Sequence, residues 1–207
     1  MSHYFIPDDK LSRNISYIDY TFKGERFRFA VHAGVFSKDH VDPASDILLN
    51  TIPPLPPGRR LLDMGCGYGV IGIVLAKSYN LNLTSVDVNP AAIELSRTNC
   101  RLNGVESALL CSDCFAGLEL ELEREQPPTK TFTSIVINPP IHAGKSVTYR
   151  MYEQSADYLT VGGALYVVTL KKHGAESTIA KLTELFGRCE VLYKKKGIYV
   201  LRAVKSQ

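Results

Sequence analysis

The feature that most constrains this chain is an apolar segment that runs directly into alternating glycines. It reads Arg60-Leu61-Leu62-Asp63-Met64-Gly65-Cys66-Gly67-Tyr68-Gly69 and continues as Val70-Ile71-Gly72-Ile73-Val74-Leu75-Ala76. The pattern predicts a buried strand, a glycine turn and a helix. Glycine adopts positive φ and has no Cβ, so Gly65, Gly67 and Gly69 let the main chain bend sharply and approach a ligand closely. The segment therefore predicts a ligand site at the carboxyl end of a strand.

The chemistry of the ligand is indicated by Asp63. Residues 67–72 also fit the dinucleotide fingerprint G-x-G-x-x-G, and a turn that only packs strand against helix is the alternative without a ligand. A pyrophosphate on this turn would face the Asp63 carboxylate, whereas an ammonium or sulfonium group would be attracted to it. S-adenosylmethionine carries both cations and no phosphate. Asp63 to Gly69 resembles the D-x-G-x-G-x-G motif of seven-stranded S-adenosylmethionine-dependent methyltransferases, which implies cofactor contacts from this turn, Cys66 included.

The rest of the chain alternates between the two kinds of regular structure. We expect strands over 81–87, 108–111, 133–137, 164–169, 190–193 and 198–203, and helices over 69–79, 90–103, 146–159 and 174–186. Such alternation predicts a parallel sheet with right-handed crossovers. Residues 15–31 alternate in the manner of a hairpin around Lys23-Gly24, and a short helix is expected near 46–50.

The expected fold class is therefore α/β. We expect a Rossmann-like, seven-stranded, mostly parallel sheet, closed by an antiparallel hairpin and flanked by helices, with an N-terminal β-hairpin appendage. Residues 1–50 would form the appendage and a lid segment packed on the main domain, and residues 51–207 the methyltransferase domain.

Acidic residues stand where two further strands are expected to end. Asp87 follows the second strand, where a carboxylate accepts hydrogen bonds from the two ribose hydroxyls of an adenosine ligand. Val88 is its neighbour and is counted with the cofactor site. Asp113 follows the third strand; the family resemblance implies an acceptor for the adenine amine there, and a turn or helix-cap role is the alternative.

The fourth strand is followed by Asn138-Pro139-Pro140. Two successive prolines remove two amide donors and fix the backbone, which leaves carbonyl oxygens and the Asn138 amide at the strand end. An exocyclic amine would be held out of conjugation if Asn138 Oδ1 and the Pro139 carbonyl each accepted one N–H, and its developing positive charge would be stabilised. We therefore expect these three residues to be catalytic, Asn138 also lying against the cofactor; an ordinary turn is the alternative.

The Asn-Pro-Pro segment resembles the [D/N]-P-P-[F/Y/W/I] motif of amino-methyltransferases acting on adenine N6, guanine N2 or glutamine. Together with Gly34-Val35-Phe36-Ser37, Asp42 and Ser45, the run Asn138-Pro139-Pro140-Ile141-His142-Ala143-Gly144-Lys145 is similar to the 16S ribosomal RNA guanine-N2 methyltransferase family from about residue 13 onward. This resemblance implies guanine N2 as the nucleophile and a cofactor lid that includes Phe36 and Ser37. Ile141 replaces the aromatic residue that often stacks on the target base.

The residues that follow the catalytic motif, and a run of lysines near the end of the chain, have functions that the sequence does not decide. Ile141, His142 and Lys145 follow the catalytic motif and are expected to contact the substrate, with His142 or Lys145 meeting a phosphate or base edge. A solvated loop is the alternative for both. Residues 194–196 are three successive lysines, which are more often a solvated hairpin tip than a nucleic-acid contact.

Composition sets the remaining bounds. The 207-residue chain has a net charge of +3, which permits an anionic partner such as ribosomal RNA or the small ribosomal subunit. The first ten residues lack signal-peptide features and no apolar run is long enough for a membrane span, so we expect a cytoplasmic protein. Its sequence leaves open whether it is a monomer or a homodimer. Methylation of a protein glutamine or small amine is one alternative function, and a non-catalytic RNA-binding or assembly module is another.

The five cysteines predict neither a disulfide framework nor a metal site. Their number is odd and their spacing does not repeat, which agrees with a reducing compartment. Cys111 and Cys114 form a single C-x-x-C, and a zinc site would need two further ligands at suitable spacing. We expect two half-buried thiols at a strand end instead.

Overall fold

The computed structural model describes residues 15–32, 40–118, 132–140 and 144–206. Its strands are β1 (Ile15–Phe22), β2 (Glu25–His32), β3 (Arg60–Met64), β4 (Asn82–Asp87), β5 (Ser107–Cys111), β6 (Phe132–Ile137), β7 (Leu159–Leu170), β8 (Cys189–Lys195) and β9 (Ile198–Val204). Its helices are α2 (Pro43–Thr51), α3 (Val70–Tyr79), α4 (Pro90–Asn103), α6 (Gly144–Tyr158), the 3₁₀ turn η1 (Lys171–His173) and α7 (Ala175–Phe186). None of these helices is long and apolar enough to cross a membrane.

Seven of the described strands form one sheet in the order β5-β4-β3-β6-β7-β9-β8. Strands β3 to β7 pair in parallel, and β9 runs antiparallel to both β7 and β8. Because these strands are parallel, the carboxyl ends of β3, β4, β5 and β6 lie along one edge of the sheet. The strand order steps outward from β3 in both directions, so it reverses beside β3. Ligands of open α/β sheets bind at this edge, next to the point where the strand order reverses. The expected seven-stranded α/β fold is confirmed.

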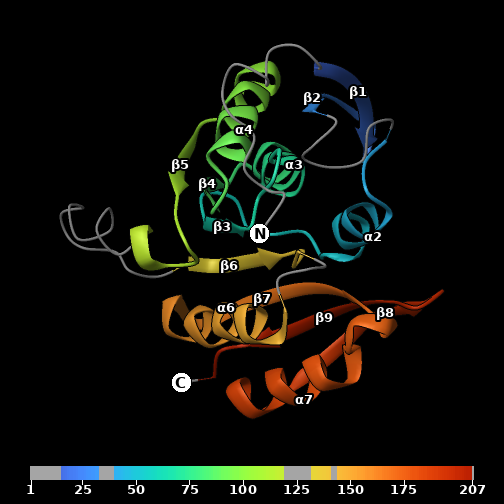
Figure 1. Cartoon of the computed structure of the whole chain (residues 1–207), viewed down its shortest axis with the longest axis vertical. Coiled ribbons are helices and arrows are strands. Elements are labelled where there is room, and N and C mark those ends of the chain that lie inside the picture. The colour runs from blue at the N-terminus through green and yellow to red at the C-terminus, as the bar shows by residue number, and fades with distance from the viewer. Residues whose placement is uncertain (1–14, 33–39, 119–131, 141–143, 207) are drawn as a thin grey trace.

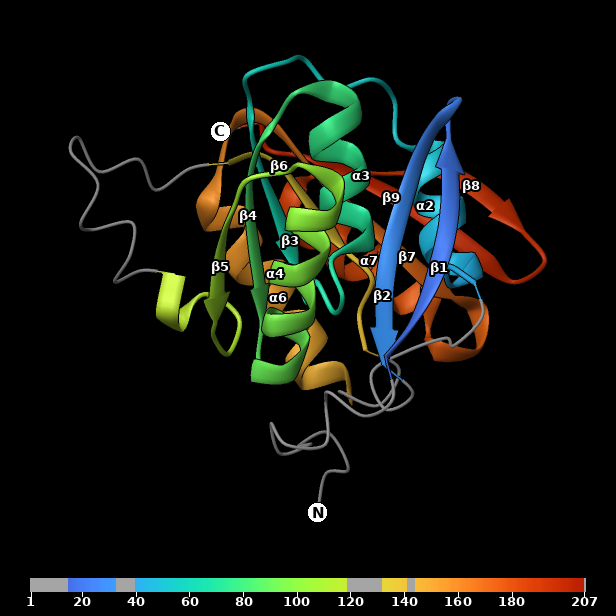
Figure 2. The same cartoon turned by 90° about the horizontal axis from the view of Figure 1, so that it is seen from above.

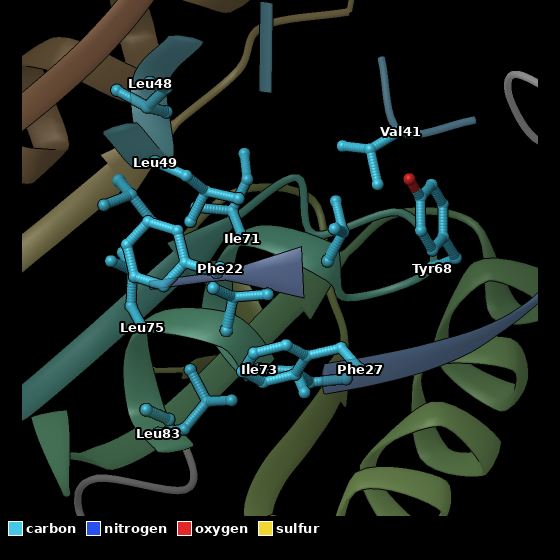
Figure 3. Close-up of a cluster of buried hydrophobic side chains, with 14 of the residues drawn as sticks. Phe22, Phe27, Val41, Leu48, Leu49, Tyr68, Ile71, Ile73, Leu75 and Leu83 are labelled. Atoms are coloured by element: carbon cyan, nitrogen blue, oxygen red, sulfur yellow. The ribbon is translucent and has the colours of Figure 1, made fainter. Parts of the chain in front are cut away.

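The sheet lies between two layers (Figures 1 and 2). Helices α2, α3 and α4 and the β1–β2 hairpin cover one face, and α6 and α7 cover the other. Each face has its own buried apolar cluster. In the first cluster, shown in Figure 3, side chains from the hairpin, α2, α3 and β4 meet; they include Phe22, Phe27, Leu48, Leu75 and Leu83. Burial of these side chains attaches the hairpin to the sheet domain.

Two asparagines of α4 complete the attachment of the hairpin. Asn99 exchanges two hydrogen bonds with the backbone of Ala30, and Asn103 exchanges two with the backbone of Arg28. The side-chain amides thereby satisfy backbone groups on the free edge of β2. Asn99 also donates to the Tyr68 carbonyl at 2.8 Å. The same residue therefore links the hairpin to the glycine turn.

Most element boundaries lie close to where they were expected, and the larger differences are at α2 and β7. Helix α4 begins after the capping side chain of Asn89 and ends at Gly104 in the left-handed region, as expected. Helix α2 is longer than the expected 46–50, because the Asp42 side chain caps it and Pro43 occupies its first turn. Strand β7 begins at Leu159 rather than 164, and its pairing with β6 shifts register between Phe132 and Ser134.

Candidate active site

The glycine turn is held to the neighbouring strand at the edge where the ligand is expected. The amides of Gly65 and Cys66 both donate to the Val86 carbonyl of β4, at 2.8 and 3.0 Å. Gly65, Gly67 and Gly69 have φ values of 74°, 55° and 89°, which only glycine adopts readily. The turn therefore has the backbone shape that its glycines predicted. Burial raises the pKa of the Cys66 thiol well above its usual value, so this side chain stays neutral.

Asp63 lies beneath the turn rather than on the surface. Its side chain is 1% exposed, and its Oδ2 accepts from the Gly72 amide in the first turn of α3 at 2.8 Å. Burial raises its pKa to about 7. A Cβ on Gly72 would stand 2.8 Å from that same oxygen, so glycine is needed for the close approach of helix and strand. Asp63 is therefore placed to influence a ligand through its electric field rather than by direct contact.

Asp87 ties the second strand end to the glycine turn. Its Oδ2 accepts from the Gly67 amide and its Oδ1 from the Asn89 amide, both at 2.9 Å. Burial raises the pKa of this carboxyl. Each carboxylate oxygen has further acceptor capacity beyond one amide. The adjacent Val88 is 62% exposed and forms an open apolar surface beside the carboxylate.

Asp113 lies at the neighbouring strand end but has a protein partner. Strands β4 and β5 pair Asp87 with Cys111, so Asp113 follows two residues beyond that pair. Its Oδ1 accepts from Arg150 of α6 at 2.5 Å, and its side chain is 56% exposed. An incoming adenine amine would share this acceptor with the guanidinium. The structure brings the turn, Asp87, Val88 and Asp113 to one edge of the sheet.

Asn138 is oriented by the beginning of α2. Its Nδ2 donates to Asp42 Oδ2 at 3.1 Å and to Ser45 Oγ at 2.9 Å. Asp42 Oδ2 also accepts from the Ser45 amide at 3.0 Å, which is the capping bond of α2. An ionised carboxylate can only accept, so the group facing Asp42 must be the amide's donor, Nδ2. The acceptor Oδ1 therefore takes no bond from Asp42.

A pocket of about 210 Å³ opens beside Asn138. Its wall is formed by Asn138, Pro139 and Pro140, by the beginnings of α2 and α6, and by the end of β7 with η1. Lys145 and Thr148 of α6, Thr169 of β7 and His173 of η1 contribute polar side chains; Tyr152 and Leu170 contribute apolar surface. The pocket has the size and mixed lining suited to one planar heteroaromatic base.

Four residues predicted for the site, Phe36, Ser37, Ile141 and His142, lie outside the described residues. Lys145 lines the pocket, as a substrate contact requires. The orienting roles of Asp42 and Ser45 and the lining roles of Thr169 and His173 were not predicted. Asp42-Pro43 did carry a helix-start signal, whereas no local signal marked Thr169 or His173.

The cysteines differ from expectation in their exposure. Cys111 is exposed and Cys114 is buried, so the pair is not half-buried as expected; all five thiols are free. Cys114 packs in the apolar cluster on the α6 and α7 face of the sheet. Within the described ranges, no group of three or more His, Cys, Asp or Glu side chains is arranged to hold a metal ion.

A sheet of this order, with a glycine turn after β3, acidic residues after β4 and β5 and Asn-Pro-Pro after β6, defines a Rossmann-like methyltransferase fold. Comparison with known proteins identifies the family. Residues 26–202 match the model of the methyltransferase small domain. The chain belongs to this family, and it is a methyltransferase by fold and sequence.

Relatives extend the comparison. The chain is 37% identical over 205 residues to the uncharacterized protein YbxB of Bacillus subtilis, with 98% of each chain covered. It is 34% identical to ribosomal RNA small subunit methyltransferase C of Cronobacter sakazakii, covering 84% of this chain and 48% of that protein. The chain thus spans about half the length of the ribosomal RNA methyltransferases that it matches.

A solved structure is similar over nearly the whole chain. It is the Thermus thermophilus 16S rRNA N2 G1207 methyltransferase in complex with AdoMet and guanosine, with a TM-score of 0.79 and 27% sequence identity. The alignment covers 93% of this chain and 51% of that one.

Proposed function

We propose that this protein transfers a methyl group from S-adenosylmethionine to an exocyclic amine, namely guanine N2 of small-subunit ribosomal RNA. The observation that carries the proposal is the orientation of Asn138. Asp42 and Ser45 hold its Nδ2, which leaves Oδ1 as the acceptor of this amide, and Asn138 and Pro139 both line the pocket. Two acceptors at a strand end suit an amine, which offers two N–H donors.

The cofactor side of the proposal rests on the edge formed by β3, β4 and β5. Bound there, S-adenosylmethionine supplies an electrophilic methyl group. Asp87 has acceptor capacity for ribose hydroxyls, and the exposed Val88 offers an apolar face for adenine. The pKa of Asp63, raised to about 7 by burial, would fall when a cation binds above it. The residues present therefore fit this cofactor, and Asp113 is proposed as the acceptor for the adenine amine.

The protein's part in the reaction is positioning. Asn138 Oδ1 and the Pro139 carbonyl would each accept one N–H of the amine, directing its lone pair out of the ring plane and toward the methyl group. Both acceptors also stabilise the positive charge that develops on nitrogen. The proton leaves after transfer, when the amine has become acidic, so a strong general base is not required. Pro139 and Pro140 keep the acceptor segment rigid.

Guanine in ribosomal RNA is proposed from the relatives, because an acceptor pair recognises an amine and not a particular base. The names of the Cronobacter and Thermus proteins both specify 16S or small-subunit RNA, and the Thermus structure holds guanosine. Small subunits are cytoplasmic, so we expect the reaction there. The chain spans about half of those relatives, so their substrate is carried over as part of this proposal.

The test is the destination of the methyl group. Given radiolabelled cofactor and small subunits or ribosomal RNA from a strain lacking this protein, the label should appear as N2-methylguanosine after nucleoside digestion. Label in N6-methyladenosine or in protein would refute the guanine assignment and favour the alternative amine substrates. RNA binding without any transfer would favour a non-catalytic module.

A variant separates chemistry from binding. Asn138→Ala should keep cofactor affinity within a few-fold and lower the single-turnover rate by about 10²–10³, the scale for loss of one preorganised group. The matched control is Asn82→Ala, at the amino end of β4 and so at the opposite edge of the sheet. Normal turnover by Asn138→Ala would mean that Asn-Pro-Pro is only a turn.

A further inference from the structure

The fold brings two basic segments together that are separate in the sequence. The amide of Lys171 in η1 donates to the carbonyl of Gly197, in the turn between β8 and β9, at 2.7 Å. Exposed lysines therefore stand on both sides of this contact: Lys171 and Lys172 on η1, and Lys194, Lys195 and Lys196 at the hairpin tip. The sequence had indicated only the second group.

This surface is continuous with the rim of the pocket. Leu170 and His173, which flank the two lysines of η1, both line the pocket. Lys145 lines it from α6, and its Cε lies 3.7 Å from where a Cβ on Gly174 would stand. We call Lys145, Lys171, Lys172, Lys194, Lys195 and Lys196 the basic ridge. It runs from the pocket, across η1, to the hairpin tip.

Few carboxylates of the described residues neutralise the basic ridge. Lys194 lies 3.8 Å from Glu176, and the ion pairs found in the described ranges include no other member of the ridge. By contrast, Lys181 on α7 lies within 3.1 Å of both Glu153 and Glu184. A row of like charges with so few counter-charges is unfavourable by itself and attracts a polyanion.

We propose that the basic ridge binds the phosphate backbone of the RNA strand whose target base enters the pocket. This inference rests on the proposed function, since it takes RNA as the substrate. A base that enters a pocket of this size must leave its stack, so the flanking nucleotides lie outside the pocket mouth. The ridge begins at that mouth and offers flexible ammonium groups, which contact phosphates without reading sequence.

The test compares two triple variants with equal changes in charge. The ridge variant is Lys171→Gln with Lys172→Gln and Lys195→Gln, which leaves the Glu176 partner Lys194 and the pocket residue Lys145 in place. The control variant is Arg26→Gln with Arg59→Gln and Arg101→Gln, three exposed cations at the opposite end of the sheet. Fluorescence anisotropy measures binding of a labelled single-stranded fragment of small-subunit ribosomal RNA over a series of salt concentrations.

Counterion release sets the size of the change expected in RNA affinity and in its dependence on salt. Each lost phosphate contact makes the log–log slope of affinity against salt shallower by about 0.7 for single strands, so the ridge variant should lose about 2 from the slope. The same relation gives an affinity about 100-fold weaker at 0.1 M salt. The control variant should keep the slope of the wild type. At saturating RNA, the single-turnover rate of the ridge variant should stay within a few-fold of the wild type.

The outcomes separate the ridge from the proposed function. Equal slopes for the ridge variant and the wild type, or wild-type binding that does not respond to salt, would overturn the ridge. A wild type that binds RNA through the ridge but leaves the label in protein would overturn the proposed function alone. Adenosylhomocysteine affinity reports whether each triple variant is folded; if the ridge variant is not, its three single variants should each lose about 0.7 from the slope.

Discussion

The hydrogen bond from Asn138 to Ser45 offers a sharp test of how the acceptor pair is positioned. Ser45→Ala removes the Oγ that accepts from Asn138 Nδ2 at 2.9 Å and that also donates a longer bond to Asp42 Oδ2 at 3.3 Å. It leaves the backbone amide of residue 45, which makes the capping bond to Asp42, in place. The substitution therefore changes the support of the Asn138 amide while keeping the cap of α2.

The expected magnitude follows from one neutral hydrogen bond, which is worth about 0.5–1.5 kcal/mol. If that free energy orients Oδ1 in the transition state, the single-turnover rate falls by roughly 2- to 13-fold. Asp42 still holds Nδ2 at 3.1 Å, so the loss stays well below the 10²–10³ expected for Asn138→Ala. Removing both supports, with Asp42→Ala and Ser45→Ala, should bring the rate close to that of Asn138→Ala.

The assay is single-turnover methyl transfer at saturating RNA and cofactor, with cofactor affinity measured by calorimetry. Affinity should remain within a few-fold in Ser45→Ala, since Ser45 acts on the acceptor. Asn50→Ala is the matched control: it removes hydrogen bonds to Asp46 on the same helix, at an exposed position. Its rate should equal that of the wild type.

A double-mutant cycle decides whether Ser45 acts through Asn138. In the Asn138→Ala background, Ser45→Ala should cost nothing further, because the amide that it supports is gone. A full and independent loss in that background would refute the reasoning. So would a Ser45→Ala variant with wild-type rate, since Asn138 would then need no second partner.

Three further predictions concern the cofactor edge. Asp87→Ala should weaken S-adenosylmethionine and S-adenosylhomocysteine by about one to two orders of magnitude in calorimetry, since a charged acceptor is worth about 1.5–3 kcal/mol; tight NAD binding with no heat from either compound would contradict the cofactor assignment. Asp63 has a pKa of about 7 in the free protein, and a bound cation favours its ionised form, so cofactor affinity should be full above that pH and fall by up to about tenfold per unit below it. Asp63→Asn should flatten this pH profile, and an unchanged profile would exclude Asp63 as its source. Gly72→Ala places a Cβ 2.8 Å from Asp63 Oδ2 and 2.9 Å from Leu83 Cδ1, which should lower the free energy of unfolding in urea by about 1–3 kcal/mol; an unchanged midpoint would show that α3 can move away from β3.

The parts of the fold that the sequence predicted are those with local causes. Apolar strand runs, the cap at Asn89 and the glycine at 104 fix where elements begin and end within a few residues, so α4 was placed without the structure. The same holds for the hairpin turn, where Lys23 and Gly24 both have positive φ. The division of the chain near residue 50 stays a prediction, although side chains from both parts share one apolar cluster.

The start of β7 was predicted wrongly, because tertiary pairing overrides a local signal there. The strand was expected over 164–169, after the glycine pair Gly162-Gly163, yet β7 begins at Leu159. The Gly162 amide donates to the Lys205 carbonyl, and the Lys205 amide donates to the Gly163 carbonyl. These bonds come from Lys205, which lies 42 positions after Gly163 in the chain, so the glycine pair is kept as an irregular part of the strand.

Site residues that directly follow one strand could be predicted from the sequence. Site residues whose role depends on contact between two distant segments could not. Asp42 carries a clear local signal, because an acidic residue before proline typically caps a helix. That signal accounts for only one of its roles: Asp42 Oδ2 accepts both the cap bond and a bond from Asn138, 96 positions away. A carboxylate oxygen can take both donors at once, so the local role leaves no trace of the second. A helix-capping residue whose acceptor can take a second donor can therefore also serve the site. The sequence shows only the capping role, and the second role becomes visible only when the fold brings the two segments together.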